Sequence, residues 1–253
     1  MTTSPNAAPC ESAIVELRRY RLHAGRRDAL IALFDREFVE TQEATGMRVI
    51  GQFRDTAEPD HFVWLRGFPD MPSRQQSLAA FYGGSVWAEQ RDAANATMID
   101  SDDVLLLRPI RRDSRFAPRI AAKRDAGDKT GSVVIVTLAR RAARERDAVE
   151  VIDLYLAPAL EARGLKTIAL YETEPSENTF PRLPVRDANV LVWIGACAAV
   201  PTPESVRSSV AGALESQQRA SAHPIPPFDA IDVAVLVPTP RSLLDGGAAS
   251  APE

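Results

Sequence analysis

The 253-residue sequence contains few of the residues and motifs that mark common catalytic sites. It has two cysteines, Cys10 and Cys197, with no C-x-x-C or zinc-finger spacing, so a structural disulfide is weakly supported and the usage is typical of a reducing cytosol. None of its three histidines forms a metal-binding pattern such as H-E-x-x-H with nearby carboxylates, so we expect no bound metal. The GxSxG, Walker A and Rossmann glycine motifs are absent, which argues against hydrolase, NTPase and dinucleotide functions and leaves no indicated cofactor.

The sequence also lacks a strong excess of one charge. Its 30 Lys and Arg residues stand against 34 Asp and Glu residues, and a net charge of −4 gives no electrostatic footprint for nucleic acid or an anionic membrane. No apolar run approaches the roughly 20 residues of a membrane span. The start, MTTSPNAAPCES, has no basic segment followed by an apolar one. We therefore expect a soluble cytoplasmic protein without a nucleic-acid partner or a membrane span.

Hydrophobic periodicity predicts the same order of elements twice: strand, helix, strand, strand, helix, strand. In the first half the strands are expected at 14–20, 47–55, 61–68 and 103–109, and the helices at 28–44 and 73–98. In the second half the strands are expected at 131–140, 165–174, 188–197 and 231–238, and the helices at 144–163 and 204–219. Short stretches also correspond, as IVELRR (14–19) does to IVTLAR (135–140) and DVLLLRP (103–109) does to DVAVLVP (232–238), which indicates an internal repeat.

This order predicts an α+β fold of two tandem ferredoxin-like (βαββαβ) units. Because the second-half strands are apolar on both faces, we expect the two sheets to pack together within the chain as a pseudo-dimeric α+β barrel. The expected domains are residues 12–110 and 131–240. A linker at 111–130 joins them, and disordered tails are expected at 1–11 and 241–253.

Alternation along the first-half strands separates an apolar face, expected under the helices, from a mixed charged and aromatic face, expected toward the barrel cavity. The second face includes Glu16, Arg18, Gln52, Arg54, Phe62, Trp64, Arg66 and Phe68. Solvent exposure of this face is the alternative interpretation, but it would leave a large aromatic patch in water. If the face is covered, Glu16 must pair with the arginines or hold a ligand with them, since an unpaired buried ion costs several kcal/mol.

The second half has lost these charges. At the positions that correspond to Glu16, Arg18 and Arg66 it carries Thr137, Ala139 and Gly195, whereas Trp64 is retained as Trp193. We infer that the first half holds the site and that the second half is mainly a structural lid.

Several first-half motifs occur in an order that resembles the NIPSNAP domain, a branch of the dimeric α+β barrel superfamily. They are GQFRD (51–55), FVWLRGF (62–68), FYGGSVW (81–87), RDAANATMIDSD (91–102) and VLLLRP (104–109). The resemblance covers residues 12–110, and residues 131–240 are similar only as a degenerate second copy. It implies a barrel of two ferredoxin-like units in a superfamily with cofactor-free monooxygenases, haem-degrading enzymes and isomerases. It implies no settled reaction for NIPSNAP domains themselves.

The candidate catalytic residues are Arg66, Glu16 and Arg54. The arginines would stabilise developing negative charge on an organic anion, while Glu16 or a bound water moves a proton. The candidate ligand-binding residues are Trp64, Arg18, Gln52, Tyr82, Trp87 and Asn95. Tyr82 and Trp87 flank Gly83-Gly84, a break that could form a mobile lip over a pocket. A core position is the alternative for Trp87 and a helix surface for Asn95, and His23 and His61 are better explained as structural residues than as bases.

Two hypotheses about function remain open. The first is a protein that binds or transforms a small, anionic organic molecule in the barrel cavity without metal or nucleotide, as a cofactor-independent monooxygenase or isomerase does. The second is a non-catalytic scaffold for protein interaction, and a homo-oligomer is compatible with either. An enclosed cavity at Arg66 favours the first hypothesis, and a closed Glu16–arginine network without a cavity favours the second.

Overall fold

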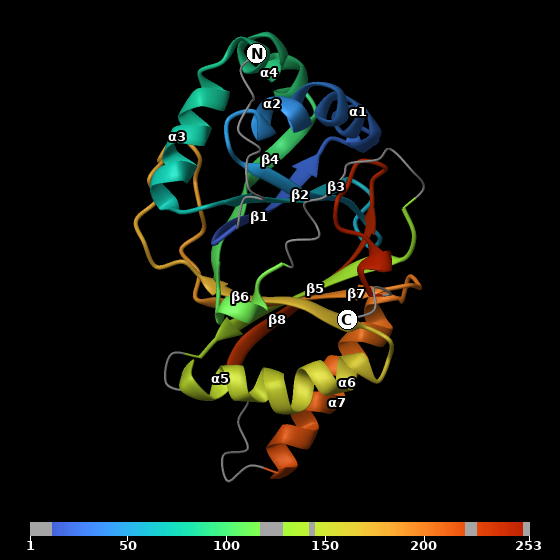
Figure 1. Ribbon diagram of the computed structural model, residues 1–253. Coiled ribbons are helices and arrows are strands. Elements are labelled where there is room, and N and C mark those ends of the chain that lie inside the picture. The colour runs from blue at the N-terminus through green and yellow to red at the C-terminus, as the bar shows by residue number, and fades with distance from the viewer. Residues whose placement is uncertain (1–11, 117–128, 142–144, 221–226, 250–253) are drawn as a thin grey trace, which may run out of the picture.

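The computed structural model describes residues 12–116, 129–141, 145–220 and 227–249 (Figure 1). The first half contains the strands β1 (Ile14–Leu22), β2 (Arg48–Asp55), β3 (His61–Phe68) and β4 (Met98–Pro109). Its helices are α1 (Arg27–Leu33), α2 (Val39–Glu43), α3 (Met71–Tyr82) and α4 (Ser85–Asn95), with a π-helical turn at Phe34–Phe38 between α1 and α2. The helix expected at 73–98 is thus two helices, which meet at Gly83-Gly84.

The second half has the same order of strands. They are β5 (Ser132–Arg140), β6 (Lys166–Thr173), β7 (Val190–Cys197) and β8 (Phe228–Pro238). Its helices are α5 (Glu145–Val151), α6 (Ala157–Glu161) and α7 (Pro203–Ala220), and a π-helical turn at Ile152–Leu156 lies between α5 and α6. Short 3-10 helices occur at Arg112–Ser114 and Gly246–Ala249. The expected tail at 1–11 and most of the expected linker, at 117–128, lie outside the described residues.

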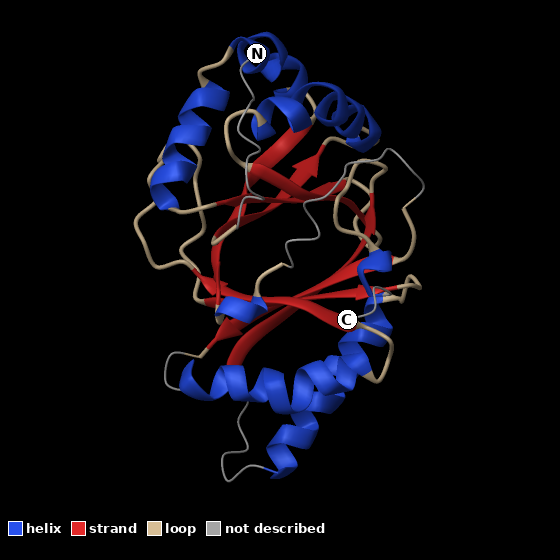
Figure 2. Cartoon of the chain, in the orientation of Figure 1, coloured by secondary structure: helices blue, strands red, loops and turns tan. Residues whose placement is uncertain are grey.

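The eight strands form a closed barrel in the order β1-β3-β2-β8-β5-β7-β6-β4. Each half contributes four antiparallel strands, and the sheet edges join where β2 pairs with β8 and β4 pairs with β6. Helices α1–α4 cover one side of the barrel, and α5–α7 cover the opposite side (Figure 2). This architecture confirms the predicted α+β barrel of two ferredoxin-like units.

The sequence assigned the two faces of the first-half strands the wrong way round. Aliphatic side chains that were expected under the helices, among them Val15, Leu17, Val63 and Leu65, pack inside the barrel with second-half residues such as Val133 and Ile135. The aromatic and charged face instead packs under α1–α4, where Trp64 and Phe62 join Phe34 and Phe81 in one cluster. A β-bulge between Val49 and Gly51 shifts the alternation along β2.

Packing explains this reversal. Two sheets closed into one barrel leave an interior that side chains from both halves must fill, and compact aliphatic residues suit that space. The helices are able to cover a charged face because they carry polar partners of their own. The candidate site is therefore between the sheet and the helices, not in the barrel interior.

The expected disordered tail from residue 241 is also corrected in its described part. The chain after β8 crosses back to β2, where the backbone N–H of Thr239 donates to Gln52 O at 2.9 Å and that of Leu244 donates to Ile50 O at 3.1 Å. Leu244 is fully buried among the barrel-interior residues. Residues 239–244 thus pack against β2 and the barrel interior.

Two further sequence expectations concern cysteine and membranes. Cys197 is a buried free thiol, and Cys10 lies outside the described residues. Within the described part of the chain, no helix has both the length and the apolar character needed to cross a bilayer.

Candidate functional site

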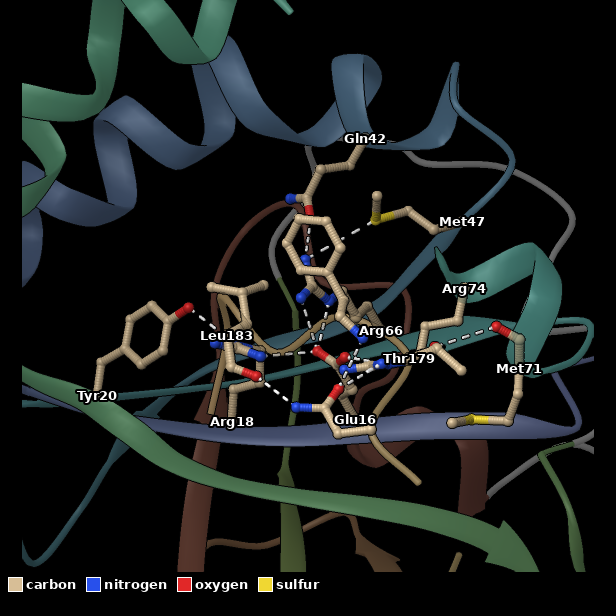
Figure 3. A network of polar contacts seen from close by, with 12 residues as sticks. Glu16, Arg18, Tyr20, Gln42, Met47, Arg66, Met71, Arg74, Thr179 and Leu183 are labelled. Atoms are coloured by element: carbon tan, nitrogen blue, oxygen red, sulfur yellow. Dashed lines mark hydrogen bonds and ion pairs between the residues drawn. The ribbon is translucent and has the colours of Figure 1, made fainter. Parts of the chain in front are cut away.

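A buried carboxylate with three arginines lies beneath the first-half helices (Figure 3). Glu16 Oε2 accepts from Arg18 Nη1 and from Arg66 Nε, each at 2.7 Å. Glu16 Oε1 accepts from Arg74 Nε at 2.7 Å. All four side chains are at most 2% exposed. Strands β1 and β3 bring Glu16 and Arg66 directly opposite each other, while α3 supplies Arg74.

Each arginine also has a second partner. Arg18 Nε donates to the Tyr20 hydroxyl at 2.9 Å, and Arg66 Nη1 donates to Gln42 Oε1 at 3.1 Å. Arg74 Nη1 reaches into the second half, where it donates to Asn178 Oδ1 at 3.0 Å and Thr179 Oγ1 at 3.3 Å. These additional partners are neutral, so they satisfy hydrogen bonds without balancing charge.

We call these four residues, Glu16, Arg18, Arg66 and Arg74, the Glu16–arginine cluster. Its electrostatics favour the ionised form of the Glu16 carboxylate. Burial by itself would raise the pKa of Glu16, but the positive charges of Arg66, Arg18 and Arg74 outweigh it and hold that pKa well below its usual range. Burial raises the pKa of Tyr20, which keeps its hydroxyl neutral. Among the described residues, no carboxylate other than Glu16 pairs with these arginines. Three positive charges thus face one negative charge.

The lowered pKa argues against the proton-transfer role that the sequence suggested for Glu16. A carboxylate held so firmly in its ionised form is a weak proton acceptor, and both its oxygens are already engaged by guanidinium groups. Glu16 is suited to hold the three arginines in place. Proton transfer in this site would fall to a water or to the substrate.

The lowered pKa predicts acid sensitivity. A carboxylate with a depressed folded-state pKa contributes stability above its unfolded pKa of about 4.3, and that contribution is lost as pH falls toward the folded value. We therefore expect the free energy of unfolding, measured by urea denaturation from pH 6 to pH 2.5, to fall steeply below about pH 4. Asp92→Asn, at an exposed carboxylate, should keep this steep fall, whereas Glu16→Gln should flatten it. An equally steep fall in Glu16→Gln would contradict the assignment.

A small aromatic cavity adjoins the cluster. Its volume is about 30 Å³, and its lining includes Tyr20, Gln42, Trp64, Tyr82 and Trp87. Such a space holds about two waters. The buried Trp64 Nε1 has no hydrogen-bond partner among the described residues, and the guanidinium of Arg66 lies 5.1 Å from the Trp64 ring centroid. Trp64, which lines the cavity, thus carries a free donor and has a cationic group against its ring.

The structure brings most of the predicted site residues together. Arg66, Glu16, Arg18 and Trp64 meet in or beside the cluster, and Tyr82 and Trp87 line the cavity. Gln52 lies opposite Trp64 on β2, fully buried, and no hydrogen bond to its side-chain amide is found in the described part of the chain.

Two predicted residues lie elsewhere. Arg54 is about a third exposed and pairs with Asp28 on α1 rather than with Glu16. Asn95 is exposed at the end of α4, which agrees with the helix-surface alternative. His23 is also exposed, and His61 is half-buried at the start of β3, away from the cluster.

Sequence reasoning missed Arg74, the third guanidinium around Glu16. The buried face of α3 consists of Arg74, Ser77, Leu78 and Phe81. These residues have the i, i+3, i+4, i+7 spacing of a helix stripe that faces a core. An arginine at the first position of such a stripe is the signal that could have identified it. Gln42 was also missed, and nothing in its local sequence distinguishes it from a surface residue.

The cluster and the cavity combine features of both functional hypotheses. The guanidinium groups close around Glu16, as expected for a structural ion-pair network. A cavity nevertheless adjoins that network, and it is bounded by the two residues, Tyr82 and Trp87, that flank the break between α3 and α4. Within the described segments, no three His, Cys, Asp or Glu side chains are grouped so as to hold a metal ion.

Comparison with known proteins agrees with the fold. A candidate monooxygenase from Fusobacterium nucleatum subsp. nucleatum is 8% identical, with a TM-score of 0.54 over 88% of this chain and 90% of that chain. A candidate monooxygenase from Lactobacillus acidophilus is 11% identical, with a TM-score of 0.51 over 90% of this chain and 94% of that chain. At these identities the likeness is one of fold.

The first half of the chain has separate matches. A search of curated proteins finds no match to this sequence. A NIPSNAP-like domain protein from Burkholderia xenovorans is 25% identical over 42% of this chain and 91% of its own, with a TM-score of 0.38. The family model NIPSNAP matches residues 15–112, which run from β1 through β4 and contain the whole Glu16–arginine cluster. Residues 15–112, the first half of this barrel, thus match the NIPSNAP family model and are called the NIPSNAP domain.

Proposed function

We propose that the NIPSNAP domain binds a small organic anion between its sheet and helices α1–α4. The observation that carries this proposal is the charge imbalance at Glu16, where three buried guanidinium groups surround one carboxylate. Buried charge without a counter-ion is costly. An anion beside Arg66 would lower that cost, and the aromatic walls at Trp64 and Tyr82 favour a ligand with a flat apolar part.

The same arrangement supports chemistry on an activated organic anion. Arg66 and Arg18 would stabilise negative charge that develops on an enolate or phenolate, in a site from which water is largely excluded. A cofactor-free oxygenation fits such a site: one atom of O₂ joins a ring carbon of a phenol, the other leaves as water, and the substrate supplies the electrons as it becomes a quinone. A cofactor-free isomerisation would use the same stabilised anion. The monooxygenase names of the two whole-chain structural neighbours agree with the first reaction.

Binding of benzoate tests the proposal. We expect isothermal titration calorimetry to detect binding to the parent protein, and Arg66→Met to weaken it at least about tenfold, because it removes one charge of a buried guanidinium site while largely keeping its volume. Arg54→Met is the matched control, since Arg54 also lies on a neighbouring strand but pairs with exposed Asp28. It should bind benzoate as the parent does.

Oxygen consumption with 1-hydroxy-2-naphthoate extends the test to turnover, which Arg66→Met should abolish. Equal effects of Arg66→Met and Arg54→Met on binding would overturn the assigned site. If benzoate and 1-hydroxy-2-naphthoate both fail to bind the parent protein, the anion site is rejected and the non-catalytic scaffold is favoured.

A further inference from the structure

The second half of the chain contributes a wall to the site in the first half. The β6–β7 segment (residues 174–189) connects two second-half strands, yet it extends beside α3 of the first half (Figure 1). Both ends of this segment are fixed to β4: Glu174 N donates to Leu106 O at 2.9 Å, and Arg186 N donates to Val104 O at 2.8 Å. Arg186 also pairs with Asp103 at 3.0 Å. Its middle is thereby held over the helix side of the NIPSNAP domain.

The middle of the segment touches the residues that bound the aromatic cavity. The Phe180 ring stacks on Tyr82, with centroids 5.9 Å apart and planes inclined by 26°. Phe180 is only 9% exposed, and Leu183 and Val185 pack against the same aromatic cluster. Tyr82 in turn is half-buried and lines the cavity. Phe180 thus covers a residue of the cavity wall from outside.

Few polar contacts hold this middle part to the helices. Arg74 donates to Asn178 and Thr179, and the Thr179 hydroxyl donates to Met71 O at 3.4 Å. The remaining polar contacts are internal: Asn178 Nδ2 donates to Leu183 O, and Phe180 N donates to Asn178 Oδ1. The segment therefore keeps its own shape, and its link to the cluster runs through a single guanidinium.

The guanidinium of Arg74 links the β6–β7 segment to the Glu16–arginine cluster. Arg74 Nε pairs with Glu16, its Nη1 binds the segment, and its buried Nη2 has no hydrogen-bond partner among the described residues. An anion that bound Nη2 and Nη1 together, in bidentate fashion, would replace the neutral Asn178 and Thr179 at Nη1. Charged acceptors bind guanidinium more strongly than neutral ones do.

We propose that Phe180 is a specificity-determining residue, which limits the size of the ligand that enters beside Tyr82, and that Arg74 links ligand binding to displacement of the β6–β7 segment. This inference rests on the proposed anion site and adds the entrance to it. A cavity of about 30 Å³ is too small for an organic anion, so entry requires a wall to move. The Phe180–Tyr82 stack is the wall that the β6–β7 segment covers, and few polar contacts hold the middle of that segment to the helices.

Two measurements on Phe180→Ala test the entrance. The first needs no ligand: in a Trp193→Phe background, Trp64 and Trp87 remain as reporters in the first half, and Phe180→Ala should raise the acrylamide quenching constant of their fluorescence at least about twofold. The second compares benzoate with the larger 2-naphthoate by calorimetry. Phe180→Ala should raise the affinity for 2-naphthoate relative to benzoate at least about tenfold. Phe180→Leu, which keeps an apolar side chain, should give smaller changes in the same direction.

Leu154→Ala is the control, because Leu154 is 59% exposed in the second half and should change neither quantity. Unchanged quenching in Phe180→Ala, with a folded protein by circular dichroism, would overturn the proposed entrance even if benzoate binds. An unchanged ratio of the 2-naphthoate and benzoate affinities, in variants that bind both anions, would also overturn the proposed entrance. Raised quenching without binding of any anion would support the entrance and reject the anion site, so the two proposals fail separately.

Discussion

Glu16→Gln is expected to destabilise the protein by about 3–5 kcal/mol, the range found when one partner of a buried ion pair is removed. The substitution keeps the shape of the side chain but removes the only carboxylate that pairs with Arg18, Arg66 and Arg74 in the described structure. Three buried positive charges then lack a counter-ion and repel one another. Chemical unfolding at pH 7, followed by circular dichroism, measures the loss.

Two further variants separate this effect from a general cost of mutation. Asp28→Asn breaks the Arg54 ion pair at a carboxylate that is 78% exposed, where such pairs contribute about 0–1 kcal/mol. Glu16→Asp retains the charge with a shorter side chain, so it should lose less stability than Glu16→Gln. A loss in Glu16→Gln as small as that in Asp28→Asn would mean that Glu16 does not balance the arginines.

Much of the fold was predictable because it depends on local patterns. The alternation of strand and helix segments, and its recurrence after residue 130, gave the two ferredoxin-like units and the barrel that the structure confirms. The orientation of each strand face was not predictable in the same way, since both faces of β1 and β3 are buried. Alternation separates two faces, but only tertiary packing decides which one meets the helices.

Part of the site was also predictable from local patterns. Glu16, Arg18 and Arg66 were identified because charges within an apolar strand are rare and must be paired. Arg54 satisfied the same alternation, yet β2 carries it to the rim of the sheet, where Asp28 binds it. Arg74 and Phe180 come from a helix and from the other half of the chain, and no pattern within β1–β3 predicts contacts of that range.

A second large effect on stability is expected at Gly195, in the second half of the chain. Gly195 occupies the position that corresponds to Arg66, and a Cβ at Gly195 would lie 2.1 Å from Cη2 of the Trp193 ring and within 2.8 Å of two more ring atoms. Trp193 is fully buried, and its Nε1 donates to Thr167 Oγ1 at 3.0 Å, so the ring has little freedom to move. Gly195→Ala should therefore destabilise the protein by about 1–3 kcal/mol, the usual cost of overpacking a core. Chemical unfolding measures this loss.

The cost of Gly195→Ala should depend on the indole ring. Gly195 is not among the glycines with positive φ, so backbone strain adds no expected cost and the clash with Trp193 is the whole argument. In a Trp193→Leu background the same substitution should cost less than half as much, which a double-mutant cycle measures.

Gly212→Ala is the matched control: that glycine is exposed on α7 with open space at its Cβ, so alanine should stabilise the helix by about 0.5–1 kcal/mol. Equal costs of Gly195→Ala in both backgrounds would contradict this account. A cost that does depend on Trp193 means that the second half has no room for a counterpart of Arg66, which restricts a Glu16–arginine cluster to the NIPSNAP domain.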